Sequence, residues 1–319
     1  MGRHLFRDIV AAALKDQVKW CDKAILLSLS LYTLVALPSA SHDTCIQHLI
    51  NSVRMTILLR GSAFITGAAS GIGQQTAIAF AQHGVTQLAL ADINQDALDI
   101  SARSLKKQFP HVHVLPVHLN VRNSMQVKEG IAKTIGKFGR LDIAVNNAGI
   151  SGSGRKTHEL DDDEWLGILD VNLQGVYRCQ KEELGVMVNQ EDLGPRVGRG
   201  RIINVGSIFA VVAPNNQDHT AYTTAKHGII GLTKADANSY GPLGIRINAI
   251  CPGYVETPLL TSIMSRDPDS PLAVDLSRTP LKRLATMEEV ADAIVLLASP
   301  MNSYMQGASM ICDGGFTSN

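Results

Sequence analysis

The chain has 319 residues, and its 29 Lys and Arg residues balance 29 Asp and Glu residues, which gives a formal net charge of zero. No basic surface field points to a nucleic-acid partner, and no acidic tail points to a disordered segment. The five cysteines are scattered without metal-ligand spacing, which predicts reduced thiols in a cytoplasmic protein and no metal site.

The first segment, residues 1–54, differs from the rest of the chain. Apolar residues recur at helical spacing over 5–18, which predicts an amphipathic helix. An apolar run over 24–37 follows, shorter than the roughly 20 residues that a membrane span needs. Three interpretations stay open: a membrane-surface or anchor segment, a helix packed on the main domain, or an extension outside the working enzyme. Met55 favours the third, since it would start a chain just before the first strand. We therefore predict an N-terminal helical or poorly ordered extension and a single domain over 55–319.

A glycine-rich turn over 66–73 connects a short apolar strand at 62–65 to a helical pattern. In this context glycines permit a tight turn, close approach of a pyrophosphate, and close packing of the helix on the strand. Backbone amides at the start of the helix then face an anion. The alternative is a glycine turn that binds no cofactor. The residues predicted to bind the cofactor here are Gly67, Ser70, Gly71, Ile72 and Gly73.

A second strand, at 86–91, ends in Asp92. An acid about 20 residues after the glycines is where a carboxylate binds the adenosine ribose hydroxyls. The same carboxylate repels a 2′-phosphate, and no Arg or Lys lies in the glycine turn or directly after Asp92 to hold one. NAD is therefore favoured over NADP, and the alternative for Asp92 is a solvated turn residue.

Helices and strands continue to alternate, with helices expected over 97–109 and 124–138 and strands over 113–119 and 141–145. This alternation predicts an α/β fold, a Rossmann-like, doubly wound parallel sheet with helices on both faces. Ligands of such sheets bind beyond the carboxyl ends of the strands. The residues that fall there are Asn120, Asn147, Ala148 and Gly149.

Tyr222 and Lys226 lie four residues apart in a helix predicted over 221–240, so both fall on one face. A free tyrosine is a poor base at neutral pH, because its pKa is about 10. A fixed ammonium nearby lowers the pKa of the phenol and fits it for general acid–base work. The alternative is an exposed helix face, since this spacing also occurs by chance.

Two further polar residues are candidates for the same site as Tyr222 and Lys226. Asn172 lies inside a long helix predicted over 164–188, where Asn is a poor helix former, so the alternatives are a kink or a core polar residue. Ser207 follows a strand predicted over 201–205, and a loop and a turn would bring its hydroxyl to Tyr222 over the end of the sheet. A serine there can bond a substrate oxygen, although such a residue is more often only part of a turn.

The remainder of the chain completes the predicted sheet. A sixth strand over 246–250 runs into a turn over 251–257. Residues 258–284 contain several prolines and mixed apolar and polar side chains, and we expect them to form a lid over the substrate. A helix over 288–297 and a strand over 308–312 follow.

Three motifs in this order resemble the short-chain dehydrogenase/reductase family in its short single-domain branch. They are the glycine turn over 66–73, the Asn-Asn-Ala-Gly segment over 146–149, and the pair of Tyr222 and Lys226. The resemblance covers residues 57–316. It implies that the Asn-Asn-Ala-Gly segment supports the sheet and lies against the cofactor.

The resemblance also implies a catalytic tetrad of Asn172, Ser207, Tyr222 and Lys226. Ser207 positions the substrate oxygen, and Tyr222 passes a proton to it or takes one from it. Lys226 lowers the pKa of Tyr222 and holds the nicotinamide ribose, and Asn172 holds a water in line with the lysine.

Further cofactor contacts follow from the same resemblance. Asn120 stands where an aspartate facing the adenine is common, and its amide oxygen can still accept a hydrogen bond there. The turn after the sixth strand closes over the nicotinamide, with contacts from Pro252, Gly253, Val255 and Thr257. The helices around Asn172 and Tyr222 are expected to pair in a homodimer or homotetramer.

These features predict an oxidoreductase that transfers a hydride between NAD(H) and a secondary alcohol or ketone. The stretches around 218–222 and 241–260 resemble members found in fungal secondary metabolism, which implies a terpenoid or polyketide alcohol. The alternative function is a non-catalytic dinucleotide-binding scaffold or redox sensor. The complete tetrad argues against it, because a sensor would not need all four residues.

Overall fold

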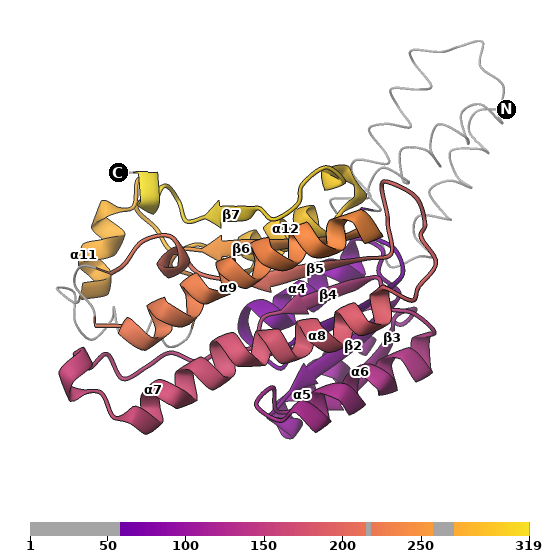
Figure 1. Ribbon diagram of the computed structural model, residues 1–319, viewed down its shortest axis with the longest axis horizontal. Coiled ribbons are helices and arrows are strands. Elements are labelled where there is room, and N and C mark those ends of the chain that lie inside the picture. The colour runs from indigo at the N-terminus through magenta and orange to yellow at the C-terminus, as the bar shows by residue number, and fades with distance from the viewer. Residues whose placement is uncertain (1–57, 215–217, 258–270, 319) are drawn as a thin grey trace, which may run out of the picture. The chain divides into compact units, whose positions relative to one another are not determined.

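The computed structural model describes residues 58–214, 218–257 and 271–318 (Figure 1). The extension predicted over 1–54 and the first part of the predicted lid, residues 258–270, lie outside the described residues.

Seven parallel strands form one sheet in the order β3-β2-β1-β4-β5-β6-β7. Strand order runs outward from β1 to β3 and then restarts on the other side of β1 with β4. This reversal is the topological switch point at which α/β sheets bind ligands. The predicted Rossmann-like fold is confirmed. The strands are β1 (Ser62–Thr66), β2 (Gln87–Asp92), β3 (His113–His118), β4 (Ile143–Asn146), β5 (Gly200–Val205), β6 (Ile245–Pro252) and β7 (Ser309–Cys312).

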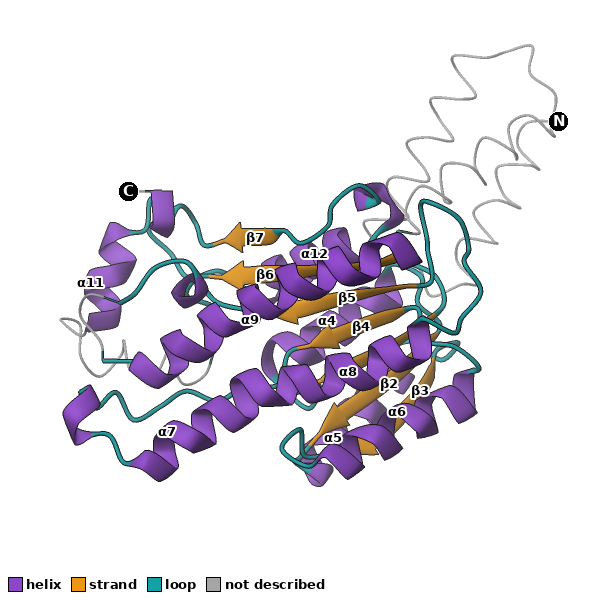
Figure 2. Cartoon of the chain, in the orientation of Figure 1, coloured by secondary structure: helices purple, strands orange, loops and turns teal. Residues whose placement is uncertain are grey.

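Helices cover both faces of the sheet (Figure 2). Successive side chains of a strand point to opposite faces. Ala63 and Ile65 accordingly enter one hydrophobic core, and Phe64 between them enters the other. Strands buried on both faces read as continuous apolar runs, which explains the sequence of β1. The helices are α4 (Gly71–Gln82), α5 (Gln95–Gln108), α6 (Ser124–Phe138), α7 (Asp162–Leu169), α8 (Val176–Met187), α9 (Thr220–Tyr240), α11 (Pro271–Arg278) and α12 (Met287–Ala298).

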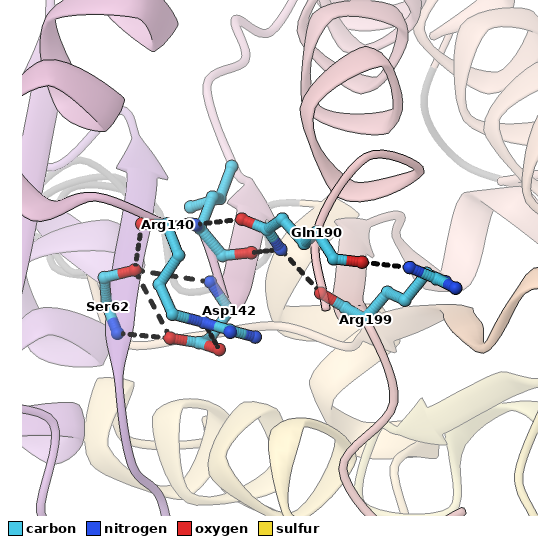
Figure 3. Close-up of polar contacts among 6 residues, drawn as sticks. Ser62, Arg140, Asp142, Gln190 and Arg199 are labelled. Carbon is cyan, nitrogen blue, oxygen red and sulfur yellow. Dashed lines mark hydrogen bonds and ion pairs between the residues drawn. The ribbon is translucent and has the colours of Figure 1, made fainter. Parts of the chain in front are cut away.

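A polar cluster closes the amino end of the sheet between β1 and β4 (Figure 3). Asp142 accepts a hydrogen bond from the Ser62 amide at 2.9 Å and pairs with Arg140 at 2.7 Å. The Gln190 side chain accepts from the Leu141 amide at 2.6 Å and donates to the Leu141 carbonyl at 2.9 Å. Gln190 thus makes with the Leu141 backbone the two hydrogen bonds that a neighbouring strand would make, and these bonds hold the loop that leads to β5.

We expect Gln190→Ala to lower the free energy of unfolding by about 1–3 kcal/mol, because it leaves backbone groups without their partners. Gln190 also donates to the Arg199 carbonyl at 2.6 Å, so three hydrogen bonds are lost together. Urea unfolding of the variant measures the change. Asn189→Ala is the matched control, since Asn189 makes an exposed hydrogen bond to Gly185 at 2.9 Å. Equal stability of the two variants would contradict the bridging role.

Candidate active site

The glycine turn between β1 and α4 has the backbone that its sequence predicts. Gly67 has a φ of 67° and Gly71 a φ of 57°, both in the left-handed region that favours glycine. A Cβ atom on Gly73 would collide with the carbonyl oxygen of Gly67. Each of these three positions therefore needs a glycine for a reason that the structure shows.

The amino end of α4 fits an anion. The helix begins at Gly71, and the Ser70 side chain makes no capping hydrogen bond to it. A Cβ atom added to Gly71 would meet no heavy atom within 4 Å, so open space lies above the turn. Free first-turn amides and the helix dipole favour a negatively charged group at such an end, and a dinucleotide pyrophosphate is one.

Asn147 and Thr66 brace the glycine turn against the end of β4. The Asn147 side-chain amide donates to the carbonyls of Thr66 and Gly67, at 3.0 and 3.2 Å. In return the Thr66 hydroxyl accepts from the backbone amides of Asn147 and Ala148, at 3.0 and 3.1 Å. The support expected of the Asn-Asn-Ala-Gly segment is thus visible. Sequence analysis did not single out Thr66, and a hydroxyl directly before the first glycine was the available signal.

Asp92 lies at the end of β2, next to the glycine turn. Its carboxylate accepts hydrogen bonds from the amides of Ala69 and Asn94, at 3.0 and 2.9 Å. Asn120 follows β3 at the same edge of the sheet, and its side-chain oxygen accepts from the Arg122 amide at 3.0 Å. The carboxylate therefore stands beside the turn, whereas the Asn120 oxygen already takes part in a local turn.

Ser207, Tyr222 and Lys226 meet beyond the ends of β5 and β6. Ser207 and Tyr222 line the same cavity, and the Ser207 hydroxyl contributes to the pKa of the Tyr222 phenol. The Ser207 oxygen accepts from the Phe209 amide at 3.2 Å, which fixes its position. The Lys226 ammonium donates to the Val205 carbonyl at 2.8 Å and lies 5.4 Å from the centre of the Tyr222 ring.

The pKa of Tyr222 differs from the sequence-based expectation. Burial raises the pKa of the phenol, and the hydrogen bond from Ser207 opposes this only in part. The Lys226 ammonium lies over the ring and is directed to the Val205 carbonyl, so it does not dominate the titration of the hydroxyl. Burial in turn lowers the pKa of Lys226 to about 8. The net direction of the Tyr222 pKa is therefore upward, whereas the sequence predicted a lowering by Lys226.

Asn172 lies in a widened helical turn. The predicted helix over 164–188 is interrupted by a π-helical turn, Asp170–Gly175, between α7 and α8. Asn172 is fully buried, and its side chain exchanges two hydrogen bonds with the Ile150 backbone, at 2.8 and 2.7 Å. Single π-turns inside helices occur often at functional sites. A Cβ atom on Gly149 would lie 3.1 Å from the Asn172 side-chain oxygen and 3.8 Å from the Lys226 ammonium.

A cavity of about 370 Å³ opens at this end of the sheet. The predicted residues that line it are Ile72, Asn147, Gly149, Ser207, Tyr222, Lys226, Pro252, Gly253, Val255 and Thr257. The other predicted residues do not line it and belong to the adjoining turn, strand ends and helix: Gly67, Ser70, Gly71, Gly73, Asp92, Asn120, Ala148 and Asn172. Sequence analysis missed three aromatic wall residues, Phe209, His219 and Tyr254.

The described residues offer neither a metal site nor a membrane span. Over 58–214, 218–257 and 271–318, no group of three His, Cys, Asp or Glu side chains is arranged to hold a metal ion. Cys179, Cys251 and Cys312 are free thiols. Within the described chain, no helix combines the length and apolar character that crossing a bilayer requires.

Comparisons with known proteins agree with this geometry. Residues 67–317 match a family model described as enoyl-(acyl carrier protein) reductase. The short-chain dehydrogenase anuF of Penicillium roqueforti is 36% identical over 275 residues, which cover 82% of this chain and 98% of anuF. The cis-4-hydroxycyclohexanecarboxylate dehydrogenase of Sinomonas cyclohexanicum is 37% identical over 255 residues, which cover 80% of this chain and 96% of that enzyme.

The fold comparison leads to the same family. A crystal structure of a short-chain type dehydrogenase/reductase from Mycobacterium marinum superposes with a TM-score of 0.75 and 32% identity, and it covers 84% of this chain and 99% of that one. The glycines of the turn, strands β2 to β7 and the Ser207–Tyr222–Lys226 cluster lie within residues 67–317, which the family model matches. The chain belongs to the short-chain dehydrogenase/reductase family of oxidoreductases.

Proposed function

We propose that the protein transfers a hydride between NAD(H) and a secondary alcohol or ketone. The observation that carries the proposal is the placement of Ser207, Tyr222 and Lys226 in one cavity, with the Lys226 ammonium 5.4 Å from the centre of the Tyr222 ring. Two hydroxyl donors aimed at one carbonyl oxygen stabilise the negative charge that develops on it. Membership of an oxidoreductase family supplies the reaction class.

The chain's own residues account for the movement of the proton. In the reducing direction, protonated Tyr222 donates to the carbonyl oxygen while Ser207 holds that oxygen. In the oxidising direction, the phenolate form of Tyr222 takes the hydroxyl proton of the substrate. Lys226 holds a cation close to the Tyr222 ring and is proposed to bind the nicotinamide ribose. The backbone of Ile150 fixes Asn172 beside Gly149, where it is proposed to support this group.

The nicotinamide supplies or accepts the hydride when it is bound. The turn at Gly67, Gly71 and Gly73 would hold the pyrophosphate, and the Asp92 carboxylate would bind the adenosine ribose. The segment from Pro252 to Thr257 would close over the nicotinamide. These assignments are supported by the open amino end of α4 and by the position of Asp92 beside the turn.

The names of two relatives agree with a secondary alcohol or ketone as the substrate. The Sinomonas relative is named for the dehydrogenation of a hydroxyl-bearing ring acid, and anuF is named a short-chain dehydrogenase. A terpenoid or polyketide alcohol and a homodimer or homotetramer stay predictions from the sequence.

We expect purified protein to bind NADH more tightly than NADPH, and Asp92→Asn to weaken NADH binding about tenfold while NADPH binding is kept or gained. A charge-assisted hydrogen bond to a ribose hydroxyl is worth about 1.5–3 kcal/mol, and the same charge repels a 2′-phosphate. Titration with each cofactor, followed by nicotinamide fluorescence, measures both affinities.

Asp96→Asn is the matched control, because Asp96 is an exposed acid in the first turn of α5 and makes the same change of charge. Tighter binding of NADPH by the unaltered protein would overturn the assignment of Asp92. Failure to bind either cofactor would count against hydride transfer altogether.

A further inference from the structure

Three aromatic rings surround the hydroxyl groups of the proposed catalytic pair. Phe209 follows Ser207 by two residues, His219 precedes Tyr222 by three, and both line the cavity. Tyr254 lines it from the segment after β6. Three aromatic rings thus form part of the cavity wall, which they share with the aliphatic side chains of Ile72, Ile150, Val205, Ile208 and Val255.

Phe209 is the centre of this aromatic wall. Its side chain is buried, and its ring centre lies 6.3 Å from that of His219, nearly stacked at 29°. It meets Tyr222 edge-to-face at 6.4 Å and Tyr254 edge-to-face at 6.3 Å. These are the separations and angles that aromatic pairs prefer, so the wall is preorganised.

Tyr254 is held in place from behind the wall. Its hydroxyl donates to the Asp275 carboxylate at 2.5 Å, and Asp275 on α11 is almost fully buried. Its ring also meets Phe316 edge-to-face at 5.7 Å. Because Asp275 engages the hydroxyl, Tyr254 offers the cavity an aromatic surface rather than a polar group.

The wall is also nearly free of charge. Among the described residues that line the cavity, Lys226 is the single Lys or Arg residue and no acidic side chain occurs. Lys226 is already engaged by the Val205 carbonyl. Burial lowers the pKa of His219, so its ring is neutral at neutral pH. A free carboxylate or phosphate on the substrate would find no partner on this wall.

We propose that the cavity takes an uncharged cyclic alcohol or ketone, whose ring packs against Phe209, His219 and Tyr254. This inference rests on the proposed hydride transfer and narrows its substrate. On oxidation, the ring carbon loses a hydride to NAD⁺ and its hydroxyl proton passes to the Tyr222 phenolate, which leaves a cyclic ketone, NADH and the neutral phenol. A rigid ring fills a preformed aromatic wall without the loss of rotational freedom that an open chain suffers.

The test compares ring and open-chain alcohols of equal carbon number with the full chain and NAD⁺. Cyclohexanol is paired with hexan-2-ol, and menthol with decan-2-ol, and kcat/KM is measured for each. We expect the ring alcohol to be preferred about tenfold or more in at least one pair, since each immobilised flexible group costs about 0.5–1.5 kcal/mol. Phe209→Leu and Tyr254→Leu keep apolar volume but remove the rings, and each should reduce the preference severalfold.

Tyr304→Leu is the control, because Tyr304 is fully exposed and lines a separate pocket with Gly244 and Arg246 at the amino end of β6. It should leave the preference unchanged. Equal or faster turnover of the open-chain alcohols would overturn the ring inference while hydride transfer stands. A ring preference that survives both wall substitutions would also overturn it. Bound NADH with no oxidation of any of the four alcohols would count against the proposed function itself.

Discussion

Tyr222→Phe should lower kcat by about a thousandfold, within the range of 10²–10⁴ that a positioned acid or base contributes. The substitution removes the Tyr222 hydroxyl, which lines the cavity with Ser207 and is proposed to pass a proton to a substrate oxygen. NADH affinity should change little, because the ring that packs on Phe209 and lies under Lys226 is kept. Steady-state turnover and NADH fluorescence, measured on the same preparation, separate the two effects.

Tyr177→Phe is the matched control, since Tyr177 is exposed on α8 and should tolerate the loss of its hydroxyl. If Tyr222→Phe kept full turnover, another group would have to move the proton. If it kept its biological effect while turnover was lost, the non-catalytic scaffold or sensor would become the better explanation.

Local sequence was sufficient for the order of the elements. Strand β1 is a short, mostly apolar run before glycines, and α4 begins at Gly71 within the glycine turn, so both could be predicted from neighbouring residues. The π-turn around Asn172 could not, because it depends on two hydrogen bonds to Ile150, which lies 22 residues away. A long helix with one awkward Asn was the most that its sequence could indicate.

The candidate site also has features that the sequence alone could not predict. The spacing of Tyr222 and Lys226 predicted their proximity, but burial, which a sequence does not state, reversed the predicted direction of the tyrosine pKa. The aromatic wall was missed for a related reason. Phe209, His219 and Tyr254 lie on three separate segments, and only the folded sheet brings their rings together.

Glu183 on α8 is a further residue that no sequence motif indicated. Its side chain is fully buried, and one carboxyl oxygen accepts from the Asn146 amide at 3.0 Å. The other carboxyl oxygen and the Asn146 side-chain oxygen are buried with no hydrogen-bond partner among the described residues. Burial raises the pKa of Glu183 to about 8, so the carboxyl group is protonated at neutral pH.

Asn146 connects this carboxyl group to a longer polar chain. The Asn146 amide also donates to Asn204 at 3.1 Å, Asn204 donates to Gln180 at 2.7 Å, and Gln180 donates to Asp236 at 2.6 Å. Ionisation of Glu183 would place a charge in the core at the end of this chain. Asn147, the residue after Asn146, braces the glycine turn. The charge of ionised Glu183 would therefore also act on the end of β4 that faces the proposed cofactor site.

We therefore expect the stability of the protein to fall as the pH rises from about 4.5 to about 8. The folded protein holds a proton on Glu183 that the unfolded chain releases, so the free energy of unfolding falls by about 1.4 kcal/mol per pH unit in this window. Once the pH exceeds the pKa of Glu183 in the folded protein, this loss of unfolding free energy is complete and amounts to roughly 4–5 kcal/mol. Glu183→Gln keeps the shape, offers an N–H to the Asn146 oxygen, and should abolish this slope.

Urea unfolding at pH 5, 6, 7 and 8 measures the slope for the unaltered protein, for Glu183→Gln and for Glu182→Gln. Glu182 is the neighbouring acid on α8 and is only half-buried, so its substitution should leave the slope in place. Parallel curves for all three proteins would show that Glu183 does not hold the proton. A flat curve for Glu183→Gln, with the slope kept in Glu182→Gln, would assign the bound proton to the buried carboxyl group of Glu183.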